Sequence, residues 1–99
     1  MKRVVETPFP SDSLIASAVQ LGEAVRAART QQGLTIETAA LAAGISKDSL
    51  CNIEAGRPTV SIGIVLRVAQ ELGVSLFFAP TRQRERVRKL IRGLANVDA

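Results

Sequence analysis

The side chains best suited to bind a ligand lie close together in the sequence, within residues 46–57. Lys47 can donate to O6 and N7 of guanine, Asn52 can pair with N6 and N7 of adenine, and Asp48 can accept from N4 of cytosine. Arg57, a little further along the chain, can pair with a phosphate. Because these residue types contact base edges and phosphates, nucleic acid is the first ligand class to consider.

Each of these residues also has an ordinary structural explanation. Lys47 can pair with a phosphate instead of a base, and Asn52 can be a plain exposed polar residue. Asp48 can stabilise the start of a helix through the helix dipole. Residue types alone leave these alternatives open, so the elements that carry the side chains matter.

The composition excludes several other kinds of chemistry. The chain has no His, Trp or Tyr, and Cys51 is its one cysteine. A zinc site of Cys and His, or a Ser-His-Asp or Cys-His catalytic group, therefore cannot form within one chain. We expect no enzymatic activity, no metal and no cofactor. A single cysteine fits a reducing compartment, and the apolar runs are far shorter than the about 20 residues of a membrane helix. We therefore expect a cytoplasmic protein with no membrane partner.

The net charge of +4 is concentrated at one end of the chain. Residues 1–81 contain seven cations and seven anions, whereas residues 82–99 contain six cations and two anions. The boundary falls near Pro80, since proline disfavours continuation of a helix. We therefore divide the chain into an N-terminal arm, a central domain and a basic tail, with bounds 1–10, 11–80 and 81–99.

Two short capped helices meet at a glycine in the middle of the central domain. A helix over 36–43, capped by Thr35, is followed after Gly44 by a helix over 47–55, capped by Ser46. Buried apolar residues of the second helix leave its polar residues facing outward near its start. This pattern is typical of a helix-turn-helix, whose second helix enters the major groove of DNA.

Further helices are predicted on both sides of this pair. Apolar residues at helical spacing predict a helix that begins at a Ser11 or Ser13 cap and ends at Gln32, with an alternative break near Ser17. A fourth helix follows Ser61. The next segments are a strand over 74–78, a closing proline and a basic amphipathic helix over about 82–95.

Four short motifs resemble the Xre/Cro-type helix-turn-helix family over about residues 21–78. They are Gly33-Leu34-Thr35, Gly44-Ile45-Ser46, Ile53-Glu54-Ala55-Gly56 and Leu72-Gly73-Val74-Ser75. The resemblance implies an all-α, lambda-repressor-like five-helix bundle that binds operator DNA as a dimer. It also implies that Arg29 pairs with Glu54 beneath the surface.

The chain departs from the family pattern at Ile36, where family members usually carry Gln. Either a phosphate or base contact is missing there, or Ile36 touches a thymine methyl group. The predicted DNA-contacting residues are Thr35, Ile36, Ser46, Lys47, Asp48, Ser49, Asn52 and Arg57.

The residues from Gly56 to Val60 and from Leu72 to Pro80 resemble the HipB-like subgroup. That resemblance implies a strand that pairs with its copy across a dimer axis. Many members are antitoxins that repress their own operon and bind a HipA-like kinase toxin.

The predicted strand carries two consecutive aromatic side chains, which point to opposite faces. At most one of Phe77 and Phe78 can enter its own core, so we expect Leu76, Phe77 and Phe78 to form a homodimer interface. The alternative is a terminal strand folded onto its own chain. The basic tail has three interpretations: a helix that packs on the body, added affinity for DNA, or docking of a partner protein.

Two functions remain. The first is a sequence-specific repressor that binds a palindromic operator as a dimer. The second is a protein-interaction module that binds and neutralises a toxin kinase, with weak or no DNA binding. The neutral charge of residues 1–81 and the apolar Ile36 favour the second.

Overall fold

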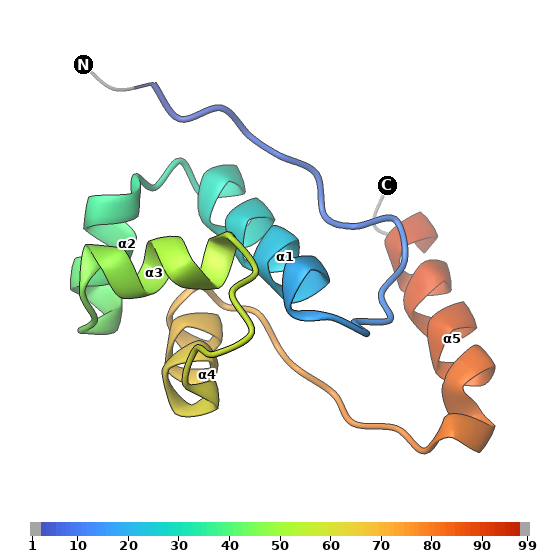
Figure 1. The fold of residues 1–99 in the computed structure, drawn as a ribbon. Coiled ribbons are helices and arrows are strands. Elements are labelled where there is room, and N and C mark those ends of the chain that lie inside the picture. Colours follow the sequence, from blue (N-terminus) through green and yellow to red (C-terminus); the bar gives the residue numbers. More distant parts are fainter. Residues whose placement is uncertain (1–2, 98–99) are drawn as a thin grey trace.

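The computed structural model describes residues 3–97, and within them the chain is all-helical (Figure 1). It forms five α-helices and one short 3-10 helix, η1. Their bounds are α1 Ala18–Gln31, α2 Ile36–Ala43, α3 Lys47–Glu54, α4 Ile62–Glu71, η1 Thr81–Gln83 and α5 Arg84–Val97. The predicted all-helical fold with a helix-turn-helix is confirmed. Residues 1–2 of the predicted arm and 98–99 of the predicted tail lie outside the described residues.

The first helix begins later than a Ser11 or Ser13 cap predicts. Ser17 is the N-cap, and its hydroxyl accepts a hydrogen bond from the Gln20 N–H. Upstream, the Asp12 carboxylate accepts from the Leu14 N–H at 2.9 Å. This local side-chain bond offers the backbone an alternative to helix, and the chain is non-helical until Ser17, the alternative break that the sequence predicts.

The two helices of the helix-turn-helix have the N-caps and the glycine turn that the sequence predicts. The Thr35 hydroxyl accepts from the Thr38 N–H at 3.1 Å, and the Ser46 hydroxyl accepts from the Ser49 N–H at 3.0 Å. Between the helices, Gly44 has φ of +70°, a left-handed conformation that side chains with a Cβ rarely adopt. The caps and this turn fix where α3 begins and the direction in which its first turn points.

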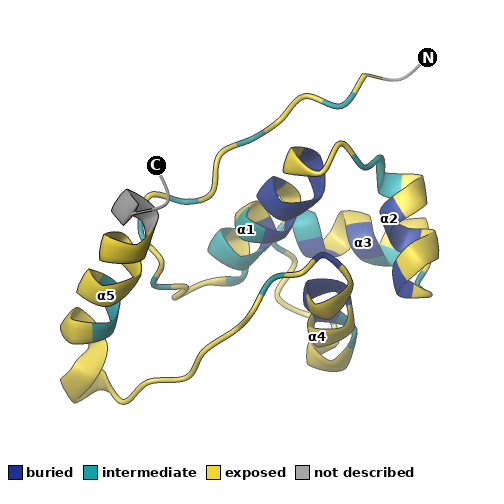
Figure 2. Ribbon diagram, turned by 180° about the vertical axis from the view of Figure 1, so that it is seen from behind, coloured by how far each residue is buried: buried dark blue, intermediate teal, exposed yellow. Residues whose placement is uncertain are grey.

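The core lies between α1, α2, α3 and α4 (Figure 2). Its largest fully buried side chains are Leu50 of α3 and Val65 and Val68 of α4. Helices α1 and α3 approach very closely at Gly22, where an added Cβ would lie 2.5 Å from the Ile53 carbonyl oxygen. Glycine is therefore required there for reasons of space.

A buried ion pair joins α1 to the end of α3. Nε of Arg29 donates to Oε2 of Glu54 at 2.6 Å, and its second terminal nitrogen donates to Oε1 at 2.9 Å. The remaining terminal nitrogen donates to the Leu34 carbonyl at 2.8 Å. The pairing that the family resemblance implies is thus present. Removal of either partner would leave a buried charge, at a cost of about 3–5 kcal/mol.

The strand predicted over 74–78 is not formed in this chain. Among the described residues none is in a β-strand, and the segment from Val74 to Pro80 runs extended and without a neighbouring strand (Figure 1). A strand exists through ladder hydrogen bonds to a neighbour, and no described segment of this chain forms such a ladder with residues 74–78. The prediction of extended backbone is right, and pairing of this segment with a second copy stays a prediction.

The chain before α1 contacts both α1 and α5 at the edge of the bundle. The Thr7 N–H donates to the Thr30 hydroxyl at 3.0 Å, which holds the arm along α1. Just after the arm, the Asp12 carboxylate pairs with Arg88 of α5, whose Nε donates at 3.0 Å. Figures 1 and 2 both show α5 beside the chain that precedes α1 and away from α2.

Candidate DNA interface

Helix α3 has one buried and one exposed face, which determines what it can offer to a ligand. Leu50 and Ile53 are buried in the core. On the other side Lys47, Asp48 and Asn52 are exposed. The side chains predicted to contact base edges are therefore accessible, on a helix whose opposite face packs in the core.

The start of α3 carries two hydroxyl groups that bond to each other. The Ser46 hydroxyl donates to the Ser49 hydroxyl at 2.8 Å while accepting from the Ser49 backbone N–H. The Ser49 hydroxyl hydrogen can still be donated outward. A capped helix start of this kind suits a phosphate oxygen, because the positive end of the helix dipole attracts anions.

The start of α2 contributes less polar chemistry than the family pattern implies. Thr35 is half-buried. Its hydroxyl accepts a hydrogen bond from the Thr38 N–H and donates one to the Thr38 hydroxyl. Ile36 is partly buried and packs against the hydrophobic core. Its position accounts for an apolar residue where a glutamine is usual, since this side chain helps to anchor α2.

Lys47 is paired across the turn with a residue that the sequence did not single out. Its Nζ lies 3.1 Å from Oε1 of Glu37 in the first turn of α2. Glu37 therefore belongs to the same surface as the predicted contacts. The helix dipole already explains an acidic residue at the start of α2, so no separate signal in the sequence indicates a role for Glu37.

The loop after α3 adds polar groups beside Asn52. A shallow hollow of about 150 Å³ is lined by Ser49, Asn52, Ile53, Arg57, Thr59, Val60, Ser61 and Ile64. Arg57 is exposed at its rim, and Ser61 makes no capping hydrogen bond although it precedes α4. Thr59 and Ser61 thus lie beside the predicted contacts Asn52 and Arg57. In the sequence, Ser61 has a sufficient explanation as the residue that precedes a helix, and Thr59 has no distinguishing signal.

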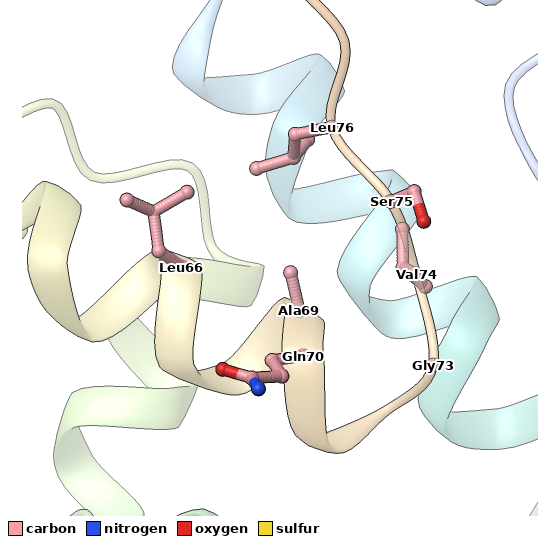
Figure 3. A pocket seen from close by; sticks show the side chains of 7 residues that line it. All are labelled: Leu66, Ala69, Gln70, Gly73, Val74, Ser75 and Leu76. Carbon is pink, nitrogen blue, oxygen red and sulfur yellow. The ribbon is translucent and has the colours of Figure 1, made fainter.

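A second surface lies between α4 and the extended segment that follows it. It is an open groove of about 330 Å³, in which Leu66 and Leu76 face one another with Ala69 between them (Figure 3). Just beyond it, Phe77 is 82% exposed and Phe78 is fully exposed. All three residues of the predicted dimer interface, Leu76 included, are therefore accessible.

No helix within residues 3–97 combines the length and apolar character needed to cross a membrane.

Comparison with known proteins matches residues 25–78 to the family model described as Helix-turn-helix. A relative from Sinorhizobium fredii, the uncharacterized HTH-type transcriptional regulator y4mF, is 38% identical over 72 residues. That match covers 72% of this chain and 95% of the relative.

The fold is similar to that of several solved HipB structures. The HipB-O4 20mer complex has a TM-score of 0.64 at 25% identity, covering 70% of this chain and 97% of that chain. The HipA-HipB-O2-O3 complex has a TM-score of 0.64 at 26% identity, with the same two coverages.

Proposed function

Since the chain belongs to the Xre-type helix-turn-helix family of transcriptional regulators, we propose that it is a sequence-specific DNA-binding repressor. It binds a palindromic operator as a homodimer in the cytoplasm and blocks transcription by occupying the promoter. The observation that carries this proposal is the exposed polar face of α3 on a helix whose other face is buried in the core.

Within this proposal, three side chains of α3 contact base edges. Asn52 pairs with adenine, Lys47 donates to guanine and Asp48 accepts from cytosine. Support comes from their exposure and from the capped start of α3, which fixes the register of these side chains.

Other residues hold the protein on the DNA backbone. Ser46, Ser49 and Thr35 lie at the two helix starts, and Arg57 lies at the rim of the hollow beside Asn52. Phosphate contacts position a protein on the duplex and supply most of its sequence-independent affinity. Ile36 anchors α2 and, in this proposal, approaches the duplex only through its exposed part.

The dimer is proposed to form through the segment that carries Leu76, Phe77 and Phe78. An extended segment with unpaired backbone groups and exposed aromatic side chains can pair with its copy about a two-fold axis. The two α3 helices would then lie about 34 Å apart and enter successive major grooves.

The direct test is a gel shift with the DNA immediately upstream of the protein's own gene. We expect the wild-type protein to shift this DNA at low salt, and Lys47→Ala and Asn52→Ala to weaken the shift by about 1–3 kcal/mol for each lost base contact. The matched control is Glu23→Gln, because Glu23 is an exposed residue of α1 that lines neither the hollow beside Asn52 nor the groove beside Leu76. If neither α3 substitution alters the shift, α3 is not the recognition helix.

A second candidate function is that of an antitoxin that binds a HipA-like kinase. The similarity to the HipB chain of the HipA-HipB-O2-O3 complex favours it. The two functions can coexist in one protein. Co-purification with the product of a neighbouring kinase-like gene tests it, and an absence of complex between the two purified proteins would contradict it.

A further inference from the structure

A salt bridge joins the two helices of the helix-turn-helix on the face proposed to meet DNA. Lys47 is the first residue of α3 and Glu37 is the second residue of α2, and their charged groups lie 3.1 Å apart. The side chains are 57% and 45% exposed. The Glu37 carboxylate, which accepts a hydrogen bond from the Lys47 ammonium, raises the pKa of Lys47. Lys47, whose ordinary pKa is 10.5, is charged at neutral pH with or without this pairing.

Helix stability does not account for a lysine at this position. The start of a helix carries partial positive charge, which disfavours a cation in the first turn. Asp48, the next residue, has the charge that this position favours. The position of Lys47 is thus unfavourable for α3 by itself, and Glu37 compensates for it from the neighbouring helix.

We infer that Glu37 is a positioning residue. It holds the ammonium group of Lys47 beside α2 and thereby limits sequence-independent binding to DNA. The inference rests on the proposed function, because it assigns a role within the same DNA-binding face. While Lys47 is paired with a carboxylate, the pair carries no net charge and attracts phosphate only weakly. Lys47 then contributes little to affinity for an arbitrary sequence.

The restraint is weak enough to be released at the correct sequence. Exposed ion pairs are screened by salt and contribute little to stability. When Lys47 leaves Glu37 for a phosphate, it exchanges one anionic partner for another and gains little. When it meets the O6 and N7 acceptors of a guanine, it gains hydrogen bonds that depend on the base. Glu37 therefore makes Lys47 contribute to sequence selection more than to general affinity.

The test measures binding of the full chain to a random-sequence duplex of about two helical turns. Fluorescence anisotropy is recorded over a range of salt concentrations for wild type, Glu37→Gln, Lys47→Ala and the double variant. Glutamine keeps the size of the side chain and removes its charge. Glu71→Gln is the matched control, because Glu71 is an exposed carboxylate at the end of α4 and its loss changes the net charge equally.

Glu37→Gln is expected to tighten binding to the random duplex by up to about eight-fold at 0.1 M salt. It should also steepen the slope of log affinity against log salt by about 0.9, the contribution of one newly available cation. In the Lys47→Ala background the same substitution should change affinity and slope far less. Glu71→Gln should resemble wild type, and Glu37→Asp, which keeps the charge, should restore most of the wild-type behaviour.

Two results would overturn the inference. One is an equal gain from Glu37→Gln with and without Lys47, since Glu37 would then act only as general negative charge. The other is no gain at all in a variant whose thermal unfolding matches wild type.

Failure of the proposed function has a different signature. If wild type binds its own upstream DNA no more tightly than the random duplex, sequence recognition is wrong whatever Glu37 does. If wild type selects its upstream DNA and Glu37→Gln changes nothing, only the restraint on Lys47 is wrong.

Discussion

Single residues determine how closely the helices of this bundle can pack and where α3 points. The Ser46 cap fixes the first turn of α3, and the Arg29–Glu54 pair fixes its last turn against α1. Gly22 permits the contact between α1 and α3 because it lacks a Cβ. Each of these residues positions α3 against the rest of the bundle, and Gly22, Arg29 and Glu54 lie off its exposed face. Substitution of these three should therefore lower the free energy of unfolding without changing the groups that α3 offers to DNA.

Gly22→Ala is expected to destabilise the protein by about 1–3 kcal/mol, because the new methyl group would clash with backbone carbonyl oxygens of α3. This result is opposite to the usual gain when alanine replaces glycine in a helix. Urea denaturation followed by circular dichroism measures the change.

Gly63→Ala in α4 is the matched control for Gly22→Ala. An added Cβ there meets only the Ser61 hydroxyl oxygen at an ordinary 3.7 Å. A small gain in stability, of about 0.5–1 kcal/mol, is expected. If both alanines stabilise the protein, the close approach of α1 to α3 is wrong.

At the scale of elements, local signals predicted the helices of the central domain well. Caps and glycines lie next to the residues they affect, so Thr35, Gly44 and Ser46 predicted the bounds of α2 and the start of α3 from sequence alone. The Ser11 or Ser13 start of α1 was wrong, whereas the alternative break near Ser17 is confirmed, since Ser17 caps the helix. The strand did not form, because no described segment provides the ladder hydrogen bonds that residues 74–78 would need.

The candidate site was predictable to the same extent. The exposed residues of α3 follow from helical periodicity, which places Leu50 and Ile53 inward. The Glu37–Lys47 pair depends on how two helices cross, and the Asp12–Arg88 pair joins residues 76 positions apart. Periodicity and capping signals carry no information on such contacts.

The contact between Asp12 and α5 gives a prediction at this scale. Asp12→Asn removes the charge that pairs with Arg88, so we expect α5 to leave the body more often. Backbone amides of α5 should exchange hydrogen several-fold faster, while those of α3 and α4 keep their protection. Hydrogen exchange measured by NMR separates the two groups, and unchanged exchange in α5 would show that the ion pair does not hold it.

The same contact should weaken in acid. The Leu14 N–H and the Arg88 guanidinium hold the pKa of Asp12 below its ordinary value of 3.8 in the folded chain. The stabilisation is therefore fully present above that ordinary value and is lost as pH falls through the lower, folded value. The protection factors of α5 amides, which correct for the intrinsic pH dependence of exchange, should fall over that acidic range in wild type and not in Asp12→Asn.

At the scale of the whole molecule, net charge and apolar surface lie at different places. The helix-turn-helix is close to neutral, the cations gather in η1 and α5, and the apolar surface lies around Leu66, Leu76 and the two phenylalanines. The +4 of the chain is thus no measure of how well α3 binds DNA. The proposed dimer would place two copies of α3 on one duplex, so that the binding free energies of the two copies add.

Substitution of Phe77 and Phe78 by Asp tests that dimer. We expect sedimentation velocity to show a dimer for wild type and a monomer for the double variant. Affinity for the upstream DNA should fall by about 100-fold or more, because the second half-site is no longer bound intramolecularly. Leu41→Asp is the control for sedimentation, because Leu41 is also an exposed apolar residue but lies on α2, outside the proposed dimer interface. A wild-type monomer at all concentrations would contradict the dimer.

The central claim is that the exposed face of α3 recognises a DNA sequence, and selection from a randomised pool of duplexes tests it most directly. The account predicts that wild type enriches a two-fold symmetric motif with half-sites about one helical turn apart. Asn52→Ala should enrich the same motif with one position in each half-site relaxed. Enrichment of no motif by wild type, or of an identical motif by Asn52→Ala, would contradict the account.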